Sequence, residues 1–297
     1  MCSSDLTKPV TASTLLEAIG AAIGVPDAPA RAAAGAKDGA DDMRRIAGTR
    51  LLLVEDNELN QELAVELLRH AGAIVTVAGN GREAIDILSG GTPLDAIIMD
   101  CQMPVMDGYE ATREIRRHPE WAQLPIIAMT ANALAGDREK VLEAGMNDHI
   151  AKPVDVKQMF ATIARWVGGT GPGKSPVLRA REAAGGALRF PGIDAAAGLA
   201  ATLNNEALYL RLLRRFHDSA NSFNDRFRAA RSGDDPAAAK REAHTLKSTA
   251  GVIGATAIAK AAAALEAACG VGNDTAIEDA LALAIAAIRP EIGRAHV

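Results

Sequence analysis

Four short apolar segments, each ending in a polar side chain, restrict what this 297-residue chain can fold into. Each has the length of a strand, and its apolar residues are continuous. Such runs are typical of strands buried on both faces of a parallel sheet. Because ligands of open parallel sheets bind at the carboxyl ends of the strands, we expect the polar ends to meet at one edge. The segments are Arg50–Asn57, Ala96–Asp100, Ile126–Thr130 and His149–Pro153, and the polar end of the last one is Lys152.

Three carboxylates stand at these strand ends. Glu55 and Asp56 close the first segment, and Asp100 closes the second. Carboxylates brought together repel one another and raise each other's pKa, so the cluster predicts a bound divalent cation. Mg²⁺ fits, because this hard ion takes one or two carboxylates together with water and phosphoryl oxygens.

The motifs at the strand ends resemble those of the receiver domain of response regulators, over about residues 50–167. The resemblance implies an α/β fold, a doubly wound five-stranded parallel sheet of the flavodoxin-like kind. The matching motifs are Glu55-Asp56, Met99–Pro104 with Met106-Asp107-Gly108, Met129–Ala131, and Lys152-Pro153. Helices are expected at 58–70, 81–89, 107–117, 133–144 and 155–166.

The same resemblance implies a role for each side chain at this edge. Asp100 would accept a phosphoryl group, Lys152 would pair with a phosphoryl oxygen, and Thr130 would hydrogen-bond another. The implied metal ligands are Asp56 and Asp100 directly, Glu55 through water, and the backbone carbonyl of Gln102. A phosphatase of the haloacid-dehalogenase type also uses an Asp nucleophile, but it needs a second acid two residues later, where this chain has Gln102.

A histidine-bearing helix is the second informative feature. His244, Lys247, Ser248 and Gly251 share one helix face because they are spaced by three, four and seven residues. A Gly inside a helix costs about 1 kcal/mol relative to Ala, and clearing space around an imidazole would explain Gly251. The strip resembles the signature of the histidine-containing phosphotransfer (HPt) domain. The alternative is an ordinary solvated helix face with one histidine.

By this second resemblance, His244 would accept a phosphoryl group and Lys247 would neutralise it. Lys240 and Arg241 extend the basic strip, and Ser248 stands where the family more often has Gly, so its role is open. After residue 192 the strand patterns end. Helices are expected near 205–231, 235–254, 255–270 and 274–289, which fits an all-α bundle.

The remaining segments divide the chain. Residues 27–49 and 168–191 have linker composition, leaving a receiver at 50–167 and an HPt domain at 192–290. Residues 1–26 resemble the last turn and helix of a preceding receiver, the alternative being an unrelated amphipathic helix. Residues 1–6 and 291–297 match the two strands of a translated sequencing adapter, a hypothesis that the nucleotide sequence would test.

Composition excludes several classes of function. The net charge is −5, and no Lys/Arg cluster indicates nucleic-acid binding. No apolar stretch reaches the roughly 20 residues of a membrane span. The three cysteines form neither a disulfide framework nor a zinc pattern, which favours a cytoplasmic location.

Together these features predict the C-terminal part of a hybrid sensor histidine kinase, whose parent would be anchored in the inner membrane. Nothing in the sequence resembles an ATP-binding domain, so the segment would relay phosphoryl groups rather than generate them, and its status as an enzyme is open. The expected partners are a histidine kinase core, in the same parent chain, and the receiver of a downstream response regulator. The alternative is a non-catalytic docking module that senses phosphorylation.

Overall fold

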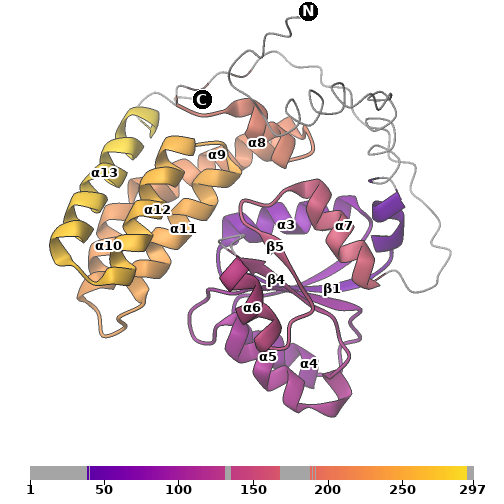
Figure 1. The fold of residues 1–297 in the computed structure, drawn as a ribbon. Coiled ribbons are helices and arrows are strands. Elements are labelled where there is room, and N and C mark those ends of the chain that lie inside the picture. Colours follow the sequence, from indigo (N-terminus) through magenta and orange to yellow (C-terminus); the bar gives the residue numbers. More distant parts are fainter. Residues whose placement is uncertain are drawn as a thin grey trace, which may run out of the picture. The chain divides into compact units, whose positions relative to one another are not determined.

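The computed structural model describes residues 39, 41–130, 135–167, 188, 190 and 192–292 (Figure 1). The expectations for residues 1–26, for most of both linkers and for the extreme C-terminus therefore lie outside the described residues. Residues 41–46, placed in the first linker by composition, are helical and bury Ile46 completely. The folded part of the chain thus begins before residue 50.

A five-stranded parallel sheet forms the centre of the N-terminal half, in the order β2-β1-β3-β4-β5. Strands β1, β3 and β4 are almost entirely buried, which explains their continuous apolar sequence. The strands are β1 (Arg50–Val54), β2 (Ile74–Ala78), β3 (Ala96–Asp100), β4 (Ile126–Thr130) and β5 (Asp148–Ala151).

Helices cover both faces of this sheet. One face carries α3 (Glu58–His70) and α7 (Val156–Val167), which pack with side chains such as Leu53 in one hydrophobic cluster. The other face carries α4 (Gly81–Ser89), α5 (Gly108–Arg117) and α6 (Ala135–Glu143), which pack with side chains such as Leu52. The alternating strand residues thus serve two separate cores, as in a doubly wound fold.

Side-chain caps fix where the helices next to the functional edge begin. Asn57 accepts hydrogen bonds from the backbone of Leu59 and Asn60 at the start of α3. Asp107 accepts one from Glu110 at the start of α5. Capping of this kind satisfies amides that have no partner inside the helix.

Helices joined by short turns make up the C-terminal half within its described residues, apart from an isolated β-bridge between Phe190 and Ile193 (Figure 1). The segment expected as one helix near 205–231 is two helices, because the chain breaks at Ser222 and both Phe223 and Phe227 turn into the core. The helices are α8 (Ala195–Ala201), α9 (Glu206–Asn221), α10 (Phe223–Ser232), α11 (Ala238–Val252), α12 (Thr256–Val271) and α13 (Asp274–Ile292). The fold class expected from the sequence, a parallel α/β sheet followed by a helical bundle, is confirmed.

Candidate functional site

The carboxyl edge of the sheet gathers the three acids. Asp100 is the last residue of β3, and Glu55 and Asp56 follow directly after β1, its hydrogen-bonded neighbour. One oxygen from each carboxylate lies within 4.8 Å of the other two. Glu55 is 1% exposed and Asp100 2% exposed, so these charges are almost completely removed from water.

Lys152, which follows β5, supplies the opposite charge. Its Nζ donates to Asp100 Oδ2 at 2.6 Å and to Glu55 Oε2 at 2.7 Å. Burial lowers the pKa of Lys152, but the charges of Asp100 and Glu55 outweigh burial and raise it above its ordinary value. The ammonium group therefore stays charged and offsets part of the repulsion in the cluster.

Burial and the remaining repulsion both act on the pKa values of the acids. Burial, with the charge of Asp100, raises the pKa of Glu55 to about 7, even though Lys152 and Asn60 stabilise its anion. Burial and Asp100 also raise the pKa of Asp56 to about 6. Oxygen-only ligands that hold excess negative charge fit a hard divalent cation, as the sequence predicted for this edge.

Two further predicted residues lie at the same edge. Thr130 is the last residue of β4 and is 2% exposed. Gln102 is in the loop after β3, and its backbone N–H donates to Asp100 Oδ1 at 3.2 Å. Gly108, at the start of α5, lies so close to this loop that a Cβ would come within 2.1 Å of the Asp100 carbonyl oxygen. The glycine thus lets α5 pack directly behind Asp100.

In the helical half, the predicted strip on α11 carries a partner that the sequence analysis missed. His244 Nδ1 lies 2.9 Å from Glu266 Oε1 on α12, and Lys247 Nζ donates to Glu266 Oε2 at 3.0 Å. Burial raises the pKa of Glu266, but hydrogen bonds and charges from His244 and Lys247 outweigh it, so the pKa lies below its ordinary range. The only sequence signal was a lone acid within the Ala-rich stretch 261–268.

The hydrogen bond to Glu266 leaves the two ring nitrogens of His244 in different environments. An ionised Glu266 accepts a hydrogen bond from Nδ1–H, which assigns the lone pair of the neutral ring to Nε2. Nε2 is buried and has no hydrogen-bond partner among the described residues. The nitrogen with a lone pair for bond formation is therefore Nε2.

The other basic residues predicted near His244 have different surroundings. Lys247 belongs to the Glu266 pair, whereas the guanidinium of Arg241 pairs with Asp235, which lies three residues before α11. Lys240 is exposed. Among the predicted basic residues near His244, Lys247 is therefore the one that binds the same carboxylate as His244, that of Glu266.

Comparison with known proteins agrees with both halves of the chain. Residues 51–164 match the family model of the response regulator receiver domain, and residues 211–293 match that of the Hpt domain. The chain contains a receiver domain and an Hpt domain. Both are domains of two-component phosphorelay signalling, as the sequence analysis expected.

Similar curated proteins are histidine kinases. The chain is 32% identical over 200 residues to the sensor histidine kinase GacS of Pseudomonas protegens, an alignment covering 66% of this chain and 22% of that protein. It is 36% identical over 156 residues to histidine kinase 1 of Arabidopsis thaliana, covering 41% and 13%. The aligned region is thus less than a quarter of either relative.

Among solved structures, the receiver region is similar to the receiver domain of a Pseudomonas aeruginosa sensor histidine kinase, which was solved with a coordinated magnesium ion. The identity is 48%, the TM-score is 0.38, and the match covers 41% of this chain and all of that one. Within the residues described for the present chain, no helix is long and apolar enough to cross a membrane.

The receiver and the Hpt domain contact each other within one compact unit that begins at Asp42. Asn60 of α3 donates to Glu55 Oε1 at 2.8 Å and to Ser248 Oγ of α11 at 3.3 Å. Ser248 lies one turn after His244 on α11, so this contact brings the His244 helix beside the acidic edge. His244, around which Gly251 was expected to clear space, is only 5% exposed.

Proposed function

We propose that this chain relays phosphoryl groups between Asp100 of the receiver and His244 of the Hpt domain. One observation carries the proposal: Asn60 donates hydrogen bonds both to Glu55 at the acidic edge and to Ser248, which lies one turn after His244 on α11. The donor to Asp100 would be a phosphohistidine of a histidine kinase core. The acceptor after His244 would be the receiver of a downstream response regulator.

The first step breaks the P–N bond of the phosphohistidine donor and forms a P–O bond to a carboxylate oxygen of Asp100. The electron pair of the broken bond returns to the donor imidazole. Lys152, already hydrogen-bonded to Asp100, would pair with a phosphoryl oxygen, and the Thr130 hydroxyl would donate a hydrogen bond to another. These contacts stabilise negative charge in the transferring group in a site that excludes water.

The second step moves the phosphoryl group to the Hpt domain. The lone pair of His244 Nε2 forms the new N–P bond while the P–O bond to Asp100 breaks and its electrons return to the carboxylate. The ring becomes an imidazolium with its proton on Nδ1, where Glu266 stabilises the positive charge. Lys247 lies one helical turn from His244 and offsets the phosphoryl charge.

Mg²⁺ would be held by Glu55, Asp56 and Asp100, whose oxygens lie together and carry excess negative charge. When bound, it supplies charge neutralisation for the acids and for the phosphoryl oxygens. The backbone carbonyl of Gln102 is the further ligand that we propose from the receiver resemblance. We place the reaction in the cytoplasm and assign the chain to a longer kinase anchored in the inner membrane.

The test uses the whole chain and radiolabelled acetyl phosphate, which phosphorylates a receiver without a kinase. In the parent, label should appear first in an acid-stable acyl phosphate and then in a base-stable phosphohistidine. His244→Gln should keep the first and lose the second, whereas Asp100→Asn should lose both. Asp86→Asn, an exposed acid on α4, is the matched control. Label that reaches Asp100 but never His244 would instead support a phosphorylation-sensing docking module.

A further inference from the structure

Two like-charged pairs face each other across the contact between the domains. Glu58 and Glu62 are four residues apart on α3, and Arg211 and Arg215 have the same spacing on α9, so each pair lies on one helix face. Arg215 Nη1 lies 2.8 Å from Glu62 Oε2, and Arg215 Nη2 lies 3.2 Å from Glu58 Oε2. Arg211 also pairs with Glu62. We call these residues the α3–α9 charge cluster.

Neither helix gains from this arrangement by itself. Like charges four residues apart repel each other and destabilise an isolated helix. Only when α3 meets α9 does each acid acquire a basic partner. The side chains also remain partly exposed, from 21% for Glu62 to 82% for Glu58. Ion pairs of this kind add little stability, but they influence association rates and exclude partners with the wrong charge.

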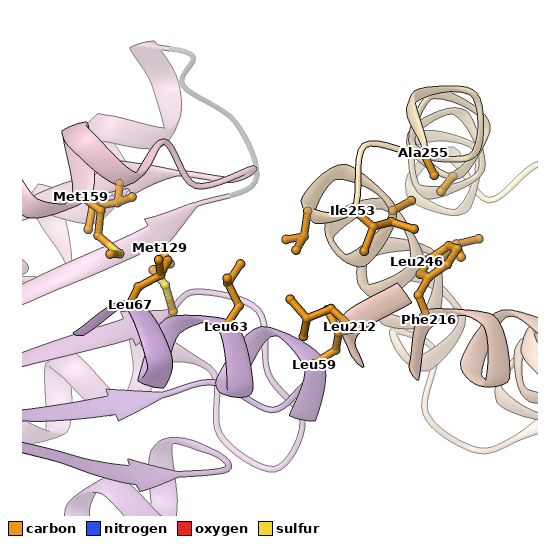
Figure 2. Close-up of a cluster of buried hydrophobic side chains, with 14 of the residues drawn as sticks. Leu59, Leu63, Leu67, Met129, Met159, Leu212, Phe216, Leu246, Ile253 and Ala255 are labelled. Carbon is orange, nitrogen blue, oxygen red and sulfur yellow. The ribbon is translucent and has the colours of Figure 1, made fainter. Parts of the chain in front are cut away.

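The charge cluster borders the contacts that bring the two phosphorylation sites together. Leu59 of α3 and Leu212 of α9 belong to one buried hydrophobic cluster, and Figure 2 shows them beside each other. One residue along α3, Asn60 donates to Ser248 of the His244 helix. One alignment of α3 against α9 and α11 therefore makes all three contacts. It pairs the charged side chains, buries Leu59 against Leu212, and brings the His244 helix beside the acidic edge.

We propose that the α3–α9 charge cluster selects the receiver of this chain as the docking partner of its Hpt domain. The inference rests on the proposed relay and names the chemistry of its partner. A receiver fits this Hpt domain when the first and fifth residues of the helix after its first strand are acidic. A receiver with basic residues there is rejected by Arg211 and Arg215. A downstream receiver must meet the same requirement to displace the receiver of this chain.

The experiment reverses and then restores the charges in the full chain. The reversal is Arg211→Glu with Arg215→Glu, and the swap adds Glu58→Arg with Glu62→Arg. Two matched controls are Arg214→Glu on α9 and Glu66→Arg on α3, both exposed and without an ion pair among the described residues. None of these side chains touches Asp100 or His244, and thermal midpoints confirm that each variant folds.

Two readouts follow each variant. The first is the rate at which label from Asp100 appears as phosphohistidine, which we expect to fall about tenfold in the reversal and to return within about twofold of the parent in the swap. The second needs no phosphate: diethyl pyrocarbonate modifies accessible imidazoles, and mass spectrometry reports His244 separately. His244 should react faster in the reversal and be protected again in the swap.

The inference is overturned if the reversal leaves both readouts at the level of the Arg214→Glu control, or if the swap restores neither. A parent chain that forms the acyl phosphate but no phosphohistidine would refute the relay. In that case the His244 protection readout still decides whether the charge cluster holds the domains together. Loss of rate in the Arg214→Glu and Glu66→Arg controls, equal to that in the reversal, would also refute the role of the specific pairs.

Discussion

Pro153 of the receiver packs against the bare backbone of Gly251 in the Hpt domain. A Cβ built on Gly251 would lie 3.3 Å from Pro153 Cβ and 3.6 Å from Pro153 Cγ. Pro153 follows Lys152, which pairs with Asp100, and Gly251 lies two turns after His244. A glycine on the docking face thus leaves room for the residue next to the receiver's lysine.

Gly251→Leu should slow transfer from Asp100 to His244 by roughly tenfold or more, because a branched side chain would hold Pro153 away. The thermal midpoint should stay level or rise, since replacing a helical Gly adds up to about 1 kcal/mol of helix propensity. Single-turnover labelling and calorimetry check the two parts. Gly270→Leu is the control, since nothing lies within 4 Å of that position. Equal transfer rates in the two variants would contradict a close fit at Gly251.

Asp56→Asn should stabilise the metal-free chain at pH 8 but not at pH 4. Folding raises the pKa of Asp56 from 3.8 to about 6. A raised pKa favours folding below about pH 4, and this contribution is lost as the pH rises through 6. This rise in pKa corresponds to about 3 kcal/mol of unfolding free energy, which screening by solvent at the partly exposed Asp56 reduces to about 1–2 kcal/mol. Urea denaturation at both pH values measures the difference.

The same variant should lose most of the stabilisation that millimolar Mg²⁺ gives the parent, and acyl-phosphate formation should slow with it. Equal phosphorylation rates in Mg²⁺ and in EDTA, for the parent chain, would contradict a metal role for the acidic edge. A gain in stability that is the same at pH 4 and pH 8 would show that ionisation of the Asp56 carboxyl is not its cause.

Lys152→Met should destabilise the metal-free chain by about 3 kcal/mol at pH 8, because Glu55 and Asp100 would be left as buried anions without their cation. Mg²⁺ should restore more stability to this variant than it adds to the parent. Thermal denaturation with and without Mg²⁺ provides the measurement. Lys157→Met, at an exposed position on α7, is the control. A variant as stable as this control would show that the buried ion pairs contribute no net stability.

Glu266→Gln should slow phosphoryl transfer to His244 by roughly tenfold to a hundredfold, the range expected for loss of a charge-assisted hydrogen bond. The ¹⁵N chemical shifts of the His244 ring should report a loss of the preferred tautomer, which a merely structural role would not produce. Asp279→Asn, exposed on α13, controls for a change of charge on the bundle. Unchanged ring shifts together with unchanged transfer would remove Glu266 from the mechanism.

Local sequence patterns determined four of the five strands, their order along the chain and the acids at their ends, whereas β2 has no continuous buried run to reveal it. A buried parallel strand needs a continuous apolar run, and its last residue lies at the same edge as that of its neighbour. The spacing of His244, Lys247 and Gly251 likewise follows from the period of one helix. Each of these inferences needs only residues within one element and the direction of the strands.

Contacts between elements were decided by the tertiary structure alone. Glu266 lies 22 residues beyond His244, and Ser248 lies 188 residues beyond Asn60. Whether such side chains meet depends on how one helix is rotated and shifted against another, and the period of a single helix does not set this. The burial of His244, the docking contact at Gly251 and the α3–α9 charge cluster therefore became visible only once α3, α9, α11 and α12 were packed together.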